Sequence, residues 1–262
     1  MNPNVRNLLY RNPQLYDLVY PEPNDETPMM CRRMFSRYLS QPPRSILDIG
    51  CGTARDLDSL SRECSDCWGV DCLPEVIAYA KGRRPHLHLA VGDMSTLRLG
   101  RTFDVILCMG STFMYALTNE DVAAALETFA AHAHDGTLLI LDINNAASYL
   151  GDGHFKPASE LRVNLPEFTA EAVSFCDFDR RRQLLTRRRK WKIQGQGEVE
   201  DFCEYRLFFP AELEQLLKER GFQVAGMFDN KELRETDLCA PRLYVPTMFH
   251  GEPKIATTSH FR

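Results

Sequence analysis

The sequence has no long apolar run, no internal repeat and no low-complexity tract. Its 262 residues are 44% hydrophobic, but no stretch approaches the roughly 18 consecutive apolar residues that a membrane-spanning helix needs. The first residues also lack the basic, then apolar, then small-residue order of a secretory signal. These absences predict a globular, cytoplasmic protein without a membrane partner, long enough for one domain with an elaboration.

Basic residues are not in excess. The formal net charge is −5 at pH 7, whereas a dedicated nucleic-acid binder needs a basic surface for phosphate contacts. The charge balance therefore disfavours DNA or RNA as a partner and favours a small molecule.

The nine cysteines stand at scattered spacings, which is untypical of a disulfide framework. Cys64 and Cys67 form a C-x-x-C, but no second pair follows at the spacing of a zinc site, and no strand-to-helix redox context precedes it. We interpret these cysteines as reduced, structural thiols and expect no metal ion.

A regular alternation of short β-branched runs and helical segments begins at residue 45. This order predicts a Rossmann-like α/β fold, in which helices cover both faces of a parallel sheet. Two later strands complete a seven-stranded core, and an antiparallel insertion of three strands is expected after the fifth strand. The expected parts are an N-terminal helical cap (residues 1–44), a core (45–145), the insertion (146–209), the end of the core sheet (210–249) and a mobile tail (250–262).

The basic run RRRQLLTRRRKWK, residues 180–192, is by itself typical of a nucleic-acid or membrane patch. An acidic strand follows the turn QGQG, so a hairpin would place Arg187 near Glu204 and Lys190 near Asp201. Such cross-strand pairs stabilise a hairpin by roughly 0.2 to 1 kcal/mol each. We therefore interpret the run as a structural strand, in an insertion that caps a pocket or forms a homodimer contact.

The stretch ILDIGCGTARDL, residues 46–57, places a glycine-rich loop after the first core strand. A dinucleotide fingerprint would have its third glycine where Arg55 stands. Asp48 at the loop base would repel a pyrophosphate but could hold a cationic amino group. Ligands of such sheets lie at the carboxyl ends of the strands, where Asp71 is placed to accept both hydroxyls of a ribose. The loop therefore predicts a nucleoside ligand without a phosphate.

Four stretches follow one another along this edge of the sheet, namely ILDIGCGTARDL, WGVD, VGDM and FDVILCMGSTFMY. Together they resemble the successive motifs of class I methyltransferases that bind S-adenosylmethionine. The chain is most similar to bacterial small-molecule members of the amino-sugar and glycine N-methyltransferase type, which share a Tyr-Asp pair near the N-terminus, here Tyr16 and Asp17. The polar residue, two prolines and aromatic residue of DNA and RNA amino-methyltransferases are absent after the fourth strand, where CMGS stands.

The resemblance implies how the methionine end of S-adenosylmethionine is held. Gly50 and Gly52 would line it, and Asp48 would support its ammonium group. The carbonyl near Met109 would face the same amine. The hydroxyl of Tyr16 would lie close to the sulfonium or the carboxylate.

The resemblance also implies the adenosine contacts. Asp71 would accept the ribose hydroxyls, Asp93 would accept the adenine amino group, and Met94 would offer its backbone N–H to the ring. Many relatives carry an arginine for the methionine carboxylate ahead of the first strand, but PEPNDETP has none. Arg32 or Arg33 in the following helix could take that place.

The implied activity is methyl transfer to a small-molecule amine or hydroxyl. An in-line displacement at a sulfonium needs the nucleophile held at roughly 3 Å from the methyl group, and a base is needed only if an amine arrives protonated. The expected catalytic or acceptor-side residues, besides Tyr16, are Tyr115, Asn144, Asn145 and His154, of which the histidine has a pKa naturally near neutrality.

Two alternatives stay open. The cofactor's own amine could attack its chain in a cyclase or lyase reaction that releases methylthioadenosine, since the carboxylate arginine is missing and polar Asn144 and Asn145 follow the fifth strand. The protein could also bind the cofactor without catalysing a reaction.

Overall fold

A parallel sheet carries the strand ends at which the site forms. The computed structural model describes residues 7–20, 25–149, 157–165, 168–195 and 197–251. Within these residues the core sheet has seven strands in the order β10-β11-β5-β4-β1-β2-β3, of which β1 to β5 are parallel. The strands are β1 (Ser45–Ile49), β2 (Asp66–Asp71), β3 (His88–Val91), β4 (Phe103–Cys108), β5 (Ala133–Asn144), β10 (Phe222–Val224) and β11 (Arg242–Phe249).

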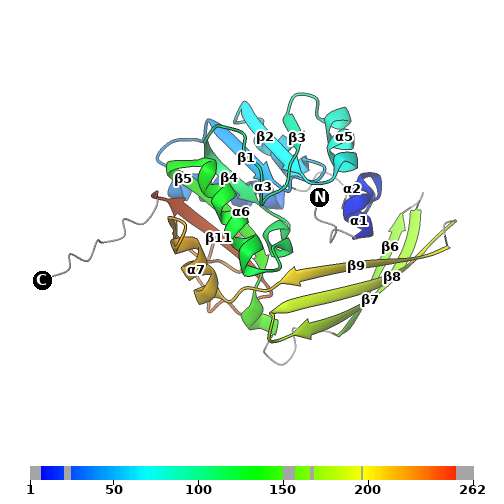
Figure 1. Cartoon of the computed structure of the whole chain (residues 1–262). Coiled ribbons are helices and arrows are strands. Elements are labelled where there is room, and N and C mark those ends of the chain that lie inside the picture. Colours follow the sequence, from blue (N-terminus) through cyan, green and yellow to red (C-terminus); the bar gives the residue numbers. More distant parts are fainter. Residues whose placement is uncertain (1–6, 21–24, 150–156, 166–167, 196, 252–262) are drawn as a thin grey trace, which may run out of the picture.

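Helices cover both faces of this sheet (Figure 1). One face packs on α3 (Glu26–Tyr38), α4 (Arg55–Leu60) and α5 (Pro74–Arg83). The other packs on α6 (Asn119–Ala131) and α7 (Pro210–Lys218). Because β1, β4 and the second half of β5 are buried between two layers, they read as nearly continuous apolar runs. No helix in the described part of the chain is long and apolar enough to cross a bilayer.

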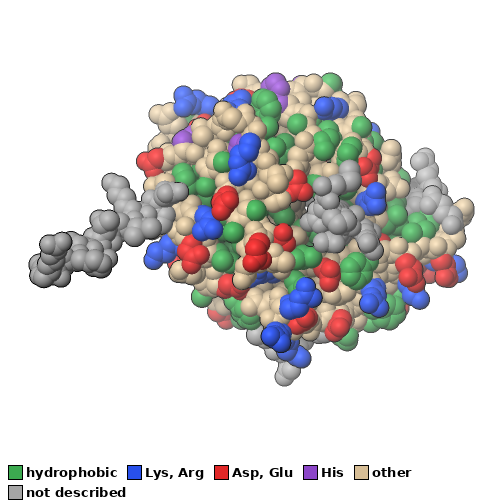
Figure 2. All heavy atoms as spheres, in the orientation of Figure 1, with side chains coloured by type: hydrophobic (Ala, Val, Ile, Leu, Met, Phe, Trp, Pro, Cys, Tyr) green, Lys and Arg blue, Asp and Glu red, His purple; other side chains and the backbone are tan. Residues whose placement is uncertain are grey.

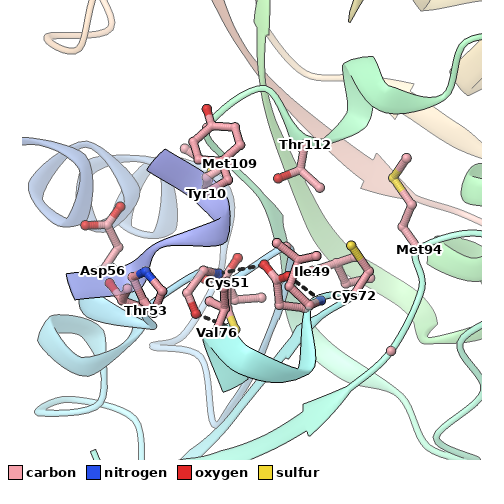
Figure 3. Close-up of a pocket in the computed structure, with 18 of the residues that line it drawn as sticks. Tyr10, Ile49, Cys51, Thr53, Asp56, Cys72, Val76, Met94, Met109 and Thr112 are labelled. Carbon is pink, nitrogen blue, oxygen red and sulfur yellow. Dashed lines mark hydrogen bonds between the residues drawn. The ribbon is translucent and has the colours of Figure 1, made fainter. Parts of the chain in front are cut away.

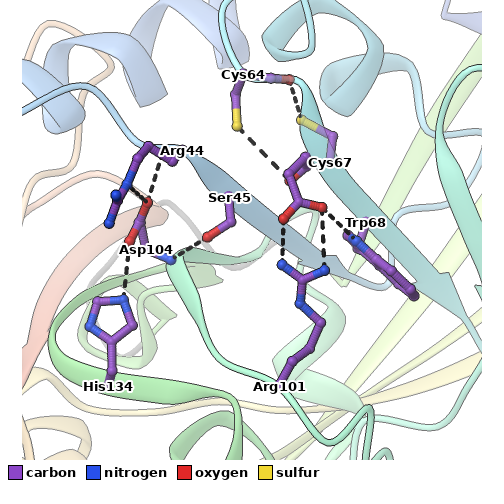
Figure 4. A network of polar contacts seen from close by, with 9 residues as sticks. Arg44, Ser45, Cys64, Cys67, Trp68, Arg101, Asp104 and His134 are labelled. Atoms are coloured by element: carbon purple, nitrogen blue, oxygen red, sulfur yellow. Dashed lines mark hydrogen bonds and ion pairs between the residues drawn. The ribbon is translucent and has the colours of Figure 1, made fainter.

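The amino ends of the core strands are fastened by a polar network on the side away from the site (Figure 4). The carboxylate of Asp104 accepts from the backbone N–H of Arg44 at 2.7 Å and lies 3.1 Å from His134 Nε2. Arg101 pairs with Asp66 beside Trp68. Cys64 and Cys67 are buried free thiols here, and no group of three metal-ligating side chains lies within the described residues.

The insertion forms a separate antiparallel sheet, in the order β6-β7-β8-β9. The expectation of three strands was wrong, because β6 adds a fourth. Its sequence ASELRVNL alternates polar and apolar residues, a pattern typical of a half-buried strand, so the sequence carried a strand signal that the prediction overlooked. The strands are β6 (Ala158–Leu165), β7 (Phe168–Asp179), β8 (Leu184–Ile193) and β9 (Gly197–Arg206).

The pairing of β8 with β9 differs by one residue from the expected hairpin. Arg187 lies opposite Cys203 instead of Glu204, and Lys190 lies opposite Glu200 instead of Asp201. A slip of one residue exchanges the two faces of a strand. The observed register buries Trp191 and turns the alternate arginines of the basic run toward the inside of the molecule.

The remaining cationic side chains of that run face outward. On the face of the molecule shown in Figure 2, basic and acidic side chains of the described residues are interspersed, without a broad patch of either sign. The pair Lys190–Glu200, with its charged groups 3.4 Å apart and both side chains exposed, is one such contact.

Two short N-terminal helices, α1 (Leu8–Arg11) and α2 (Pro13–Val19), pack their leucines on the inner face of the insertion. Asp201 of β9 fixes this contact: its Oδ2 accepts from the backbone N–H of Leu8 and from the indole N–H of Trp191, each at 3.0 Å. Its side chain is 1% exposed and lies 3.7 Å from that of Arg189, which is 5% exposed. The insertion therefore holds the N-terminal helices in place.

We predict that Asp201→Asn costs about 3 to 5 kcal/mol of the free energy of unfolding, because it leaves Arg189 buried without its counter-charge. Urea unfolding measures the change. The matched control is Glu200→Gln on the outer face of the same strand, where an exposed pair contributes about 0 to 1 kcal/mol. Equal losses in the two variants would contradict this account of the inner pair.

Candidate functional site

A single elongated cavity lies at the carboxyl ends of β1, β2 and β4, with residues of α1 and α2 over it. Its empty space, with the open solvent at its mouth included, is about 1170 Å³. Asp56 and Thr53 lie toward one end of the close-up view, whereas Met94 and Cys72 lie toward the other (Figure 3). This edge is also the point where the strand order reverses, between β1 and β4.

The loop after β1 approaches the opposite wall of the cavity very closely. Gly50 has φ +81°, and a Cβ atom built on it would stand 2.4 Å from side-chain atoms of Thr112, which begins the short helix η1 (Thr112–Tyr115). Gly52 also has a positive φ, but a Cβ atom built on it would meet no atom within 4 Å. Only glycine fits at the first of these positions, because any side chain there would collide with Thr112.

Asp48, the fourth residue of β1, is 4% exposed and lines the cavity. Its Oδ1 is buried without a hydrogen-bond partner in the described part of the protein. Burial, together with the like charges of Asp56 and Asp71, raises the pKa of this carboxyl well above its usual value. An ionised Asp48 is therefore costly until a donor or a cation reaches it.

Asp71 at the end of β2 is held by the neighbouring backbone. One carboxylate oxygen accepts from Leu73 N–H at 2.9 Å, and the other accepts from Gly52 N–H at 3.1 Å. Burial raises the pKa of Asp71, and these two backbone donors oppose the rise. Each oxygen keeps a further lone pair, so the carboxylate can accept two hydroxyl groups.

Asp93 and Met94 follow β3 and also line the cavity. One oxygen of Asp93 accepts from the backbone N–H of Ser95 at 2.9 Å and from its hydroxyl at 2.5 Å. These contacts orient the carboxyl group of Asp93. The Met94 side chain lines the cavity at the right of the close-up view (Figure 3).

Met109 reaches the cavity, but its carbonyl accepts from Thr112 N–H at 3.1 Å. The next residue, Gly110, donates its N–H to Asp142 Oδ2 at 3.1 Å, and Asp142 pairs with Arg242. Asp142 and Arg242 thus support the loop after β4. Neither residue was predicted from the sequence to support this loop, because they lie on β5 and β11, far from the loop in the sequence.

Tyr10, Tyr16 and Tyr115 form an aromatic wall on the side of the cavity nearest the insertion. The ring centroid of Tyr10 lies 6.1 Å from that of Tyr16 and 6.5 Å from that of Tyr115. Burial raises the pKa of the Tyr16 and Tyr115 phenols, so both are neutral near pH 7. Neutral phenols can orient a bound group by hydrogen bonds, but they are poor proton acceptors.

Behind this wall, the hydroxyl of Tyr115 donates to that of Tyr205 at 3.4 Å, and Arg187 Nη2 donates to Tyr205 at 2.9 Å. Arg187 lies on the same inward face of β8 as Arg189 and Trp191, opposite Cys203 of β9. No role near the cavity was predicted for Tyr10, Tyr205 or Arg187, because these residues come from distant segments that meet only in the fold.

The structure does not bring the predicted asparagines to the cavity. The amide oxygen of Asn144 accepts from Arg242 Nη1 at 3.3 Å. The Asn145 amide donates to the carbonyls of Leu238 and Ala240. Neither residue lines the cavity, because both side chains are held at the junction with the loop before β11. His154 lies outside the described residues.

The two candidate replacements for the carboxylate arginine also point elsewhere. Arg32 donates to Glu63 and to Ser59, and Arg33 donates to the carbonyl of Lys231. The cavity is lined instead by Arg55. In the sequence, Arg55 was noted only because it stands where a dinucleotide fingerprint has its third glycine.

Residues 46–136 match the family model described as a methyltransferase domain. The chain is 34% identical over 98 residues to the dTDP-3-amino-3,4,6-trideoxy-alpha-D-glucopyranose N,N-dimethyltransferase of Streptomyces venezuelae, covering 37% of this chain and 41% of that protein. It is 31% identical over 130 residues to the dTDP-3-amino-3,6-dideoxy-alpha-D-glucopyranose N,N-dimethyltransferase of Streptomyces fradiae, covering 48% and 51%. The matched stretches thus span about half or less of these relatives.

The fold is shared over nearly the whole chain. An S-adenosylmethionine-bound amino pentose methyltransferase from Micromonospora echinaspora superposes with a TM-score of 0.73 at 22% identity, covering 90% of this chain and 97% of that one. A methyltransferase from Clostridium acetobutylicum superposes with a TM-score of 0.77 at 17% identity, covering 91% and 97%. These likenesses confirm the expected core sheet with its N-terminal helices and antiparallel insertion.

We predict that Gly50→Ala destabilises the protein by roughly 2 kcal/mol or more, since the new methyl group combines backbone strain with a clash against Thr112. Gly52→Ala, which adds only the strain, should cost about 1 to 2 kcal/mol. Thermal unfolding compares them. The double variant Gly50→Ala/Thr112→Ala should regain part of the loss, and no recovery would show that the clash is not the cause.

Proposed function

Because residues 46–136 match the methyltransferase-domain family model, we propose that the protein transfers a methyl group from S-adenosylmethionine to an amine of a small molecule, with an amino sugar as the acceptor class. The observation that carries this proposal is the order of three carboxylates, Asp48, Asp71 and Asp93, around one elongated cavity. The names of the two curated relatives support the choice of acceptor.

The chain's groups fit the cofactor from one end of the cavity to the other. Asp93 and the Met94 backbone would hold adenine, and Asp71 has free lone pairs for the ribose hydroxyls. The open space at the Cβ position of Gly52 leaves room for the methionine part. Asp48, whose buried oxygen has no donor among the described residues, would receive the ammonium group.

S-adenosylmethionine supplies an electrophilic methyl group when bound. The aromatic wall of Tyr10, Tyr16 and Tyr115 would exclude water around it and position the acceptor. Because burial raises the pKa of Tyr16 and Tyr115, these phenols would orient the amine and leave its deprotonation to the medium. The acceptor would enter from the side of the insertion, near Tyr205 and Arg187.

The cyclase alternative loses its structural support. Asn144 and Asn145 bind protein groups away from the cavity, and Arg55 provides a cation beside it. A homodimer contact, a cytoplasmic location and the absence of a nucleic-acid partner stay predictions.

Product analysis tests the proposed function. The protein is incubated with S-adenosylmethionine, with and without dTDP-3-amino-3,4,6-trideoxy-alpha-D-glucopyranose, and products are identified by mass spectrometry. We expect S-adenosylhomocysteine and the N-methylated sugar only when the sugar is present. Methylthioadenosine formed without an acceptor would favour the cyclase. S-adenosylhomocysteine from a hydroxyl acceptor alone would overturn the amine assignment.

We predict that Asp48→Asn has opposite effects on stability and on cofactor binding. The folded-state pKa of Asp48 lies above its unfolded value, so ionisation of this group costs stability as the pH rises from about 4 through the folded pKa. The amide removes this cost and should raise the free energy of unfolding at pH 7 by about 1 kcal/mol or more.

The same substitution removes the partner of the ammonium group and should weaken S-adenosylmethionine binding by about 10- to 100-fold. Urea unfolding at pH 7 and calorimetric titration measure the two effects. The stability gain should shrink at pH 4, where Asp48 is protonated in the native protein. A parallel loss of stability and binding would contradict the proposed role.

A further inference from the structure

The charges around the cavity are strongly unbalanced. Among the described residues that line it, four carry carboxylates and Arg55 carries the only guanidinium or ammonium group. S-adenosylmethionine has two cationic groups, which acidic side chains can receive, and one carboxylate, which needs a cationic or N–H partner. Arg55 is therefore the cationic side chain available to that carboxylate.

In the described part of the chain, the guanidinium of Arg55 has one N–H with a hydrogen-bond acceptor and another without one. Its Nη1 donates to the carbonyl of Tyr20 just after α2, and its guanidinium carbon lies 5.5 Å from the centre of the Tyr16 ring. Its Nε is buried without a hydrogen-bond partner in the described part of the chain. A buried guanidinium N–H without an acceptor is costly, and a bound carboxylate would remove that cost.

We propose that Arg55 binds the methionine carboxylate of S-adenosylmethionine. This inference rests on the proposed function and adds to it the residue that binds the carboxylate group of the cofactor. The arginine stands on the first turn of α4, directly after the glycine-rich loop, so the loop and its cationic partner come from one continuous segment.

The position of Arg55 also links the cofactor to the N-terminal helices. Tyr16 lies under the guanidinium on α2, and the Tyr20 carbonyl follows that helix. A carboxylate bound to Arg55 would thus fix the position of the arginine side chain, which contacts this end of α2. Cofactor binding would in this way also stabilise the aromatic wall near the methyl group.

The test compares S-adenosylmethionine with its decarboxylated form, which differs from it in the carboxylate alone, and with methylthioadenosine, which lacks the whole amino-acid chain. Isothermal titration calorimetry gives the dissociation constants of S-adenosylmethionine, decarboxylated S-adenosylmethionine and methylthioadenosine for the native protein, Arg55→Met, Arg55→Lys and the control Arg33→Met. Arg33 contacts the Lys231 carbonyl and lies away from the cavity.

We expect Arg55→Met to weaken S-adenosylmethionine binding by about 10- to 100-fold, the range for a hydrogen-bonded charged pair. Its affinity for the decarboxylated ligand and for methylthioadenosine should change by no more than about twofold. Arg55→Lys should lie between the native protein and Arg55→Met, and Arg33→Met should match the native protein.

The methylthioadenosine titration also reports whether each variant is folded. Equal losses for all three ligands in both Arg55 variants, or an unchanged affinity for S-adenosylmethionine in Arg55→Met, would overturn this inference alone. Failure of the native protein to bind any of the three ligands would instead overturn the proposed function.

Discussion

The parallel pairing of β1 between β2 and β4 is the constraint on which the site depends. It sends the loops after these strands to one edge of the sheet and makes the chain reverse its order there. The backbone at Gly50 can then lie against Thr112, and the Gly52 N–H can reach the carboxylate of Asp71. Carboxylates from strands and loops far apart in the sequence are thereby collected around one cavity.

This arrangement stores unfavourable electrostatics at the site. Asp48 is buried beside other carboxylates. Among the described residues, one of its oxygens has no donor, and a buried N–H of Arg55 has no acceptor. The groups face a common cavity. A ligand with separate positive and negative ends satisfies both, and this complementarity is the physical basis of the proposed selectivity for an amino-acid-bearing nucleoside.

Much of the core could be predicted from the sequence. Buried parallel strands have short apolar runs as their sequence pattern, and the loops that follow them contain glycine and aspartate. The strand β6 was missed although its polar and apolar residues alternate, which is typical of a half-buried strand. The predicted register of β8 with β9 was wrong by one residue, since a turn with glycines at positions 195 and 197 is compatible with more than one pairing of the two strands. Tyr10, Arg187 and Tyr205 meet only through tertiary packing, and Arg55 gave no signal beyond the glycine that it replaces.

The central claim is that the cavity holds an adenosine and a methionine group in one orientation. A crystal structure with S-adenosylhomocysteine tests it most directly. The account predicts the ribose hydroxyls on Asp71, the adenine beside Asp93 and Met94, and the amino group within hydrogen-bond distance of Asp48. A ligand in the reverse orientation, or bound outside this cavity, would contradict it.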